Sequence, residues 1–282
     1  MAVSAEVPRP PAQRFDALQL GLIAALIGLA ALAWVLTRET MAGMDMGPGS
    51  DLGSLSFYVG AWVVMMAAMM FPSIAPMVRT YALIERNRRG SRAIAERSAA
   101  IVAFLAGYLL TWTAFGLTAY AIFELGRELD IAAFSWERGG PYLAGGVILA
   151  AALYQLTPLK RACLNRCRSP LDFLTERWHD GVGGALRLGL EHGAWCVGCC
   201  WALMAVLFAL GAMSVGWMAF VAALIAIEKL ATWKTAANRA IAVILVVLGL
   251  AVMIVPERVP GLTQPSSMGG AVEGMTMEDG GS

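Results

Sequence analysis

The sequence predicts an all-α protein, a polytopic bundle of transmembrane helices, from its composition and from the length of its apolar runs. Of its 282 residues, 59% are hydrophobic and only 15% are charged, and the mean hydropathy is +0.66. Soluble domains have about 25% charged residues. Apolar runs of about 18 residues recur, each long enough to cross a hydrocarbon core about 30 Å thick. We therefore expect a lipid bilayer around the chain and, with a formal net charge of +1, no nucleic-acid partner.

Seven apolar runs can be interpreted as spans. We predict them at roughly 17–37, 57–78, 98–123, 140–157, 193–212, 214–231 and 239–256. The domain plan is then a cytoplasmic N-terminal segment 1–16, a transmembrane domain 17–256 and a tail 257–282. The first apolar run is too long for a signal peptide, so we expect it to be retained. The tail is rich in Met, Gly, Ser and Pro, which predicts disorder outside the cytoplasm.

Basic residues decide the predicted orientation. The connections after the second and fourth spans are rich in Arg and Lys, whereas the loops on the opposite side are mixed or acidic. The positive-inside rule places such basic connections in the cytoplasm. The N-terminus is then cytoplasmic and, with seven spans, the C-terminus lies outside.

A group of soft ligands marks the predicted inner end of the fifth span. Cys196, Cys199 and Cys200 lie within five residues, and His192, Cys196, Cys200 and Met204 recur every four residues. Residues at this spacing share one face of a helix, and thiolate and imidazole are ligands of soft and borderline metals. Cysteine also packs well as a small apolar residue, an alternative that suffices for one cysteine. Three cysteines and a histidine on one face favour a metal site.

A second cysteine pair, Cys163 and Cys167, lies in the connection before this span. If 159–168 is helical, both thiols face the same way. The predicted topology puts all five cysteines near the reducing side of the membrane, where free thiols or metal ligands are expected rather than disulfides. The sequence leaves open whether the two groups form one site.

Methionines supply a second kind of soft ligand. Met65, Met66, Met69 and Met70 form two pairs at a spacing of four in the second span. Thioethers suit Cu(I) and are poor ligands for Mg²⁺ or Ca²⁺, although methionine is also an ordinary packing residue. Copper as Cu(I) is therefore the expected metal, with zinc or iron as the other options. Pro72 and Pro76 should break or kink this helix near its inner end.

Methionines also occur outside the predicted spans, where packing does not explain them. They are Met41, Met44 and Met46 after the first span, and Met275 and Met277 in the tail. Exposed methionines spaced by Gly and Asp suit capture of Cu(I) in an oxidising compartment. Low sequence complexity is the alternative explanation.

The sixth span ends with two adjacent charges, Glu228 and Lys229. Ionisable residues inside a membrane are costly and usually pair with other helices or mark a functional path. We expect such pairing or a reach to the interface, and consider a gate or proton site.

The segments 154–170 and 189–204 resemble the DUF2182 family of bacterial integral membrane proteins, labelled as predicted metal-binding. The run Met-Met-Ala-Ala-Met-Met-Phe-Pro of the second span and the Glu228–Lys229 pair are similar to the same family, and the likeness covers roughly 55–250. The resemblance implies a metal role in the bacterial inner membrane and no particular reaction.

These observations favour a binding protein over an enzyme: an integral membrane copper protein that transports Cu(I) or delivers it to a partner, such as a membrane copper enzyme or a copper chaperone. No nucleotide-binding loop is present, so transport would be passive or ion-coupled. One alternative is an accessory or assembly subunit of a larger membrane copper enzyme. Another is a membrane thiol oxidoreductase that uses the two cysteine groups.

Overall fold

The computed structural model describes residues 17–41, 53–89, 94–128, 139–211 and 214–259. These residues form helices and no strand, which confirms the all-α prediction. The helices are α1 (Ala17–Met41), α2 (Leu55–Arg89), α3 (Ile94–Glu128), α4 (Gly140–Gln155), α5 (Pro158–Arg168), α6 (Pro170–Arg177), α7 (Gly181–Leu210), α8 (Val215–Leu230) and α9 (Lys234–Ile254), followed by the short 3-10 helix η2 (Pro256–Arg258).

Five of the described helices, α1, α2, α3, α7 and α9, are long and apolar enough to cross a membrane by length and composition. A sixth span results if α4 and α5, which meet at a bend of 68°, count as one broken span. Helix α8 was predicted as a span but has only 16 residues. The membrane class is supported, while the count of seven and the orientation stay predictions.

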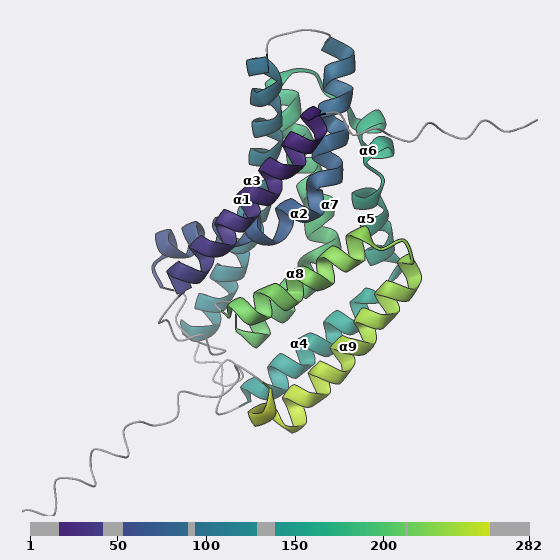
Figure 1. The fold of residues 1–282 in the computed structure, drawn as a ribbon. Helices are drawn as coiled ribbons and strands as arrows, with labels where there is room; N and C mark the ends of the chain where they lie inside the picture. The colour runs from purple at the N-terminus through teal and green to yellow at the C-terminus, as the bar shows by residue number, and fades with distance from the viewer. Residues whose placement is uncertain (1–16, 42–52, 90–93, 129–138, 212–213, 260–282) are drawn as a thin grey trace, which may run out of the picture.

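The helices form two groups that meet where α4 packs on α7 and along α8. Helix α3 packs on α7, and α1 packs on α2, while α4 and α9 run side by side as the second group (Figure 1). Helix α8 contacts members of both groups, including α2, α7 and α9. Glycines allow the closest contact: a Cβ on Gly189 of α7 would lie 2.1 Å from the Phe104 carbonyl oxygen of α3. Small residues commonly permit such approach between membrane helices.

Of the predicted break or kink at the two prolines, the break does not occur, because α2 continues through both of them, and the helix changes direction along its length (Figure 1). A proline lacks the N–H that would bond the carbonyl four residues earlier. Nearby hydroxyls donate to other carbonyls of this segment: Ser73 Oγ to Met70 O and Thr80 Oγ1 to Pro76 O, both at 2.8 Å. The segment also places Ser73 where it meets α8.

Helix α7 starts at Gly181, well before the predicted span start at residue 193. The prediction stopped at charged residues, but Arg187 and Glu191 pair with each other at 3.1 Å along the helix. Glu191 also bonds Arg177 at 3.1 Å. Cys196 therefore lies near the middle of α7, about 22 Å from its first residue at 1.5 Å per residue, and not at a helix end.

Candidate metal centre

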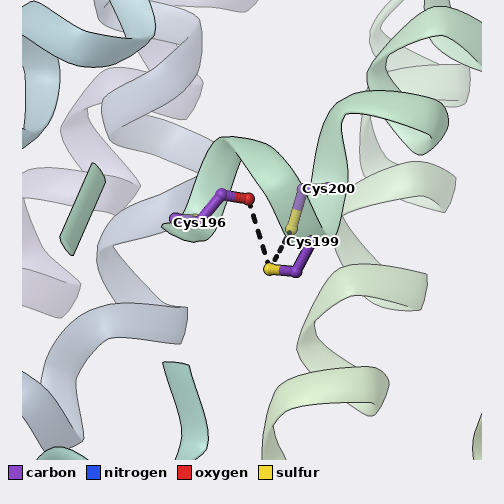
Figure 2. A group of neighbouring side chains, drawn as sticks. All are labelled: Cys196, Cys199 and Cys200. Atoms are coloured by element: carbon purple, nitrogen blue, oxygen red, sulfur yellow. Dashed lines mark hydrogen bonds between the residues drawn. The ribbon is translucent and has the colours of Figure 1, made fainter. Parts of the chain in front are cut away.

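Three thiols of α7 gather in the protein interior. The sulfur atoms of Cys196, Cys199 and Cys200 all lie within 4.8 Å of one another, and each residue is 0% exposed. The Cys199 sulfur lies 3.3 Å from the Cys200 sulfur and 3.2 Å from the Cys196 carbonyl oxygen, and the dashed lines of Figure 2 mark both contacts. Sulfurs around a metal at about 2.3 Å in a tetrahedron would lie about 3.8 Å apart. In the thiol cluster, as we call these three residues, the Cys199–Cys200 distance is below this value and all three distances are at most 4.8 Å.

Helix α5 brings a fourth sulfur to the thiol cluster. The helix starts at Pro158, where the Thr157 side chain accepts a hydrogen bond from the Lys160 amide. Cys167 Sγ lies 3.7 Å from Cys199 Sγ. Cys163 Sγ would be 3.0 Å from a Cβ on Gly198. The prediction of a helix with both thiols on one face is confirmed, since the two sulfurs meet consecutive positions of α7.

All five cysteines are free thiols, but only some of them are close together. Cys163 and Cys167 both lie outside the group whose sulfurs are within 4.8 Å of one another, and Cys163 is buried beside Gly198. The described contact between sulfur atoms of the two sequence motifs is the one between Cys167 and Cys199. The structure therefore favours Cys167 over Cys163 as a partner of the thiol cluster.

Cys196 is surrounded by polar groups from three other helices. Lys229 Nζ of α8 donates to Cys196 Sγ at 3.0 Å and to Ser73 Oγ of α2 at 3.1 Å. The Tyr108 hydroxyl of α3 lies 3.1 Å from the same sulfur. An ammonium beside a cysteine stabilises the thiolate, which is the metal-binding form. Sequence reasoning identified Lys229 but missed Ser73 and Tyr108, for which the sequence carries no distinguishing signal.

A buried ion pair lies on the other side of the thiol cluster. Lys160 Nζ of α5 is 2.7 Å from Glu228 Oε2 of α8, and both side chains are 0% exposed. Lys160 also donates to the Cys199 carbonyl oxygen. Lys160 is one of the basic residues between the predicted fourth and fifth spans, and the structure places it in a helix, buried and paired, rather than as a charge in an exposed loop. The sequence did contain a signal for this. Lys160 precedes Cys163 by three residues and Cys167 by seven, so on a helix it shares a face with both cysteines.

His192 is buried but separate from the thiol cluster. It is 1% exposed, and its ring lies among Phe104, Tyr108 and Phe173, with centroid distances of 6.0, 6.0 and 5.3 Å. Its Nδ1 has no hydrogen-bond partner among the described residues. Buried polar atoms usually have a partner, so this nitrogen remains available to a ligand. Glu191 does not orient it, because that carboxylate bonds two arginines.

The four methionines of α2 lie in the stretch of this helix between Trp62 and Ser73, which we call the methionine corridor. At one end the Trp62 and Phe208 rings stack at 5.6 Å. At the other end Lys229 joins Ser73 to Cys196. Along the chain between these contacts, the side chains of Met65, Met66, Met69 and Met70 on α2 and of Met204 on α7 are all buried.

The methionines predicted for exposed capture are largely outside the described residues, namely Met44, Met46, Met275 and Met277. Met41 is described, and the expectation of an exposed loop position is wrong for it. It is the last residue of α1, and its side chain is 1% exposed. The helix extends four residues beyond the predicted end of the span at residue 37, and this carries Met41 into the packed part of the protein.

The donor set fits a soft monovalent ion better than a hard one. Thiolates select Cu(I) or zinc and discriminate against Mg²⁺ and Ca²⁺. Lys229 places a positive charge beside the Cys196 sulfur. Arg168 interacts electrostatically with Glu228 and, more weakly, with Cys199. Such charges offset the negative charge of a thiolate complex that is buried away from water.

The comparisons with known proteins agree with this chemistry. No curated protein and no solved structure matches the chain. A family model for PpoB2, described as a copper chaperone, matches residues 59–252. This range includes all of the thiol cluster, Cys167 and the four methionines of α2, and it is close to the stretch that resembles DUF2182, a label the match does not carry. Since the match covers more than half of the 282 residues, the chain belongs to the PpoB2 copper chaperone family.

Proposed function

We propose that this membrane protein holds one Cu(I) ion at Cys196, Cys199 and Cys200 and delivers it to a partner protein. The observation that carries the proposal is the mutual distance of these three sulfurs, all within 4.8 Å, in a fully buried position. Copper is the cargo of the protein and not a resident cofactor. Zinc and iron remain the competing metals that an experiment must exclude.

Cys167 is the residue that we assign to transfer. It comes from a different helix than the other three sulfurs, and it lies 3.7 Å from Cys199. Cu(I) moves between proteins by exchange of one thiolate ligand for another, so a sulfur at the edge of the site can hold the ion while the others release it. Its own helix, α5, is short and is joined to α4 through a bend of 68°.

The methionine corridor supports a route toward the thiol cluster. Thioethers bind Cu(I) and carry no charge. They can therefore be buried between membrane helices at little desolvation cost. Met66 and Met70 are 0% exposed, as is Met204 on α7. We propose that these side chains pass the ion along α2 toward Cys196. Met44, Met46, Met275 and Met277 would collect it first, and Glu228 and Lys229 would close the far side.

Delivery passes copper to a partner protein, whereas transport moves it across the membrane. An experiment that follows where the copper goes distinguishes the two. The protein is loaded with one equivalent of Cu(I) without oxygen, reconstituted in vesicles and mixed with an external copper-free dithiol peptide. We expect the peptide to gain about one copper per chain, while a Cu(I) chelator sealed inside the vesicles gains none. The matched control is Cys167→Ser, which should load but transfer more slowly.

Copper that accumulates inside the vesicles over many equivalents per chain would contradict delivery and establish a transporter. Copper that stays on the protein in the presence of the peptide would favour the accessory-subunit alternative, in which the site serves an enzyme complex. Oxidation of the dithiol peptide by metal-free protein would instead favour a thiol oxidoreductase.

A further inference from the structure

Among the described residues, the ammonium of Lys229 donates a hydrogen bond to a sulfur of the thiol cluster, whereas Lys160 donates to a backbone carbonyl oxygen of Cys199. The described hydrogen-bond partners of Lys229 are the Cys196 sulfur at 3.0 Å and the Ser73 hydroxyl at 3.1 Å. The neighbouring carboxylate, Glu228, is engaged instead by Lys160 at 2.7 Å. Lys229 therefore brings its charge to the sulfurs rather than to a carboxylate.

We propose that Lys229 makes the thiol cluster selective for a monovalent soft cation, so that the site takes Cu(I) in preference to Zn²⁺. The inference rests on the proposed function, in which Cys196, Cys199 and Cys200 hold the metal. It adds a residue that sets which metal is bound, without itself being a ligand.

The charge balance gives the reason. Metal-bound cysteines are thiolates, so three of them carry a charge of −2 with Cu(I) and −1 with Zn²⁺. Among the described residues, the nearby cations are Lys229, in contact with Cys196, and Arg168, which acts electrostatically on Glu228 and, more weakly, on Cys199. The Lys160–Glu228 pair adds no net charge. The Cu(I) complex is therefore balanced, whereas the Zn²⁺ complex leaves one positive charge buried without compensation, which is costly away from water.

The Lys229 ammonium is held close to the position that the metal would occupy. Lys229 lies on α8 and is held by Ser73 on α2, so its charge stays beside the sulfurs even when a metal takes the Cys196 lone pair. A divalent ion at the thiol cluster would lie close to this fixed charge and would be repelled twice as strongly as a monovalent one.

The test compares the affinities of Cu(I) and Zn²⁺ for variants of Lys229 in the full chain, purified in detergent without oxygen. Each metal is titrated against a coloured chelator of known affinity. Lys229→Met and Lys229→Gln both remove the charge. The glutamine side chain can still donate a hydrogen bond to Ser73, so Lys229→Gln remains usable if the Lys229→Met protein does not fold. Lys229→Arg keeps the charge. Arg187→Met removes a positive charge from the other end of α7, where Arg187 is 64% exposed.

We expect the ratio of Cu(I) affinity to Zn²⁺ affinity to fall at least tenfold in Lys229→Met and Lys229→Gln. Lys229→Arg and Arg187→Met should stay within threefold of the unaltered protein. An unchanged ratio in both neutral variants would overturn the inference, as would an equal loss of both metals. The unaltered protein separates the two proposals: if it binds no Cu(I), the proposed function fails, whereas a bound Cu(I) with an unchanged ratio defeats only the role of Lys229.

Discussion

The sulfur of Cys167 on α5 lies 3.7 Å from the sulfur of Cys199 on α7, and this contact joins two cysteine motifs that are 32 residues apart in the chain. Cys163 is on the same helix, yet its sulfur lies against the backbone of Gly198. The two cysteines of α5 therefore have different surroundings, although the sequence alone presents them as an equivalent pair.

This difference predicts unequal effects of two similar substitutions. Cys167→Ser should slow copper transfer to a dithiol acceptor at least tenfold, because the sulfur beside Cys199 is lost. Cys163→Ser should change the transfer rate less than threefold. Stopped-flow measurement of transfer checks both variants. Equal slowing by the two substitutions would mean that the pair acts as one unit, contrary to the described geometry.

The buried pair of Lys160 and Glu228 predicts a strong effect on stability. Lys160→Met leaves the Glu228 carboxylate without its partner at 0% exposure, and breaking a buried pair on one side costs about 3–5 kcal/mol. The additional change Glu228→Leu removes the stranded charge and should recover most of the loss. Unfolding midpoints in detergent measure both variants. A double variant no more stable than Lys160→Met would show that the charge is not the cause.

The close approach of α3 and α7 predicts that Gly189 tolerates no side chain. A Cβ there would lie 2.1 Å from the Phe104 carbonyl oxygen, and because this atom is backbone, the two helices must move apart. Gly189→Ala should lower stability by about 1–3 kcal/mol. Gly146→Ala on α4 is the matched control, since nothing lies within 4 Å of its Cβ and alanine favours a helix. Equal unfolding midpoints for the two variants would contradict the described packing.

The methionine corridor predicts a change in loading rate without a change in capacity. Leucine replaces methionine with little loss of packing, so a variant with leucine at Met65, Met66, Met69 and Met70 should fold and still bind one Cu(I). Its uptake of Cu(I) from a chelate should be at least tenfold slower. Met253→Leu is the control, because Met253 packs against Gly145 on the α4–α9 pair, away from the corridor. Unchanged uptake in the fourfold variant would assign these methionines to packing alone.

Hydropathy and periodicity are sufficient for the fold class and for part of the site. Long apolar runs require helices in a membrane, so the all-α class follows from composition. The four-residue spacing of Cys196 and Cys200 is enough to predict that both thiols lie on one helix face. The sequence could not tell which helix α5 would pack against, because no local rule fixes a contact between segments that are 32 residues apart, as Cys167 and Cys199 are.

Charged residues account for the clearest errors. Counting Lys160 as a loop charge ignored a partner, Glu228, that lies 68 residues away in the chain. The start of α7 was placed too late because Arg187 and Glu191 lower local hydropathy, although they neutralise each other on the helix surface. In both cases an ion pair allows the charged residue to lie in a helix. A hydropathy window averages residues along the chain and does not take such pairing into account.

The central claim is that Cys196, Cys199 and Cys200 bind Cu(I), and metal content tests it most directly. The protein is purified without oxygen beside a variant with serine at all three positions, and both are analysed for copper, zinc and iron. Cys163→Ser serves as a control for loss of a cysteine. We predict about one copper per chain in the unaltered protein and in the control, and none in the triple variant. Copper retained by the triple variant, or zinc or iron in place of copper in the unaltered protein, would contradict the account.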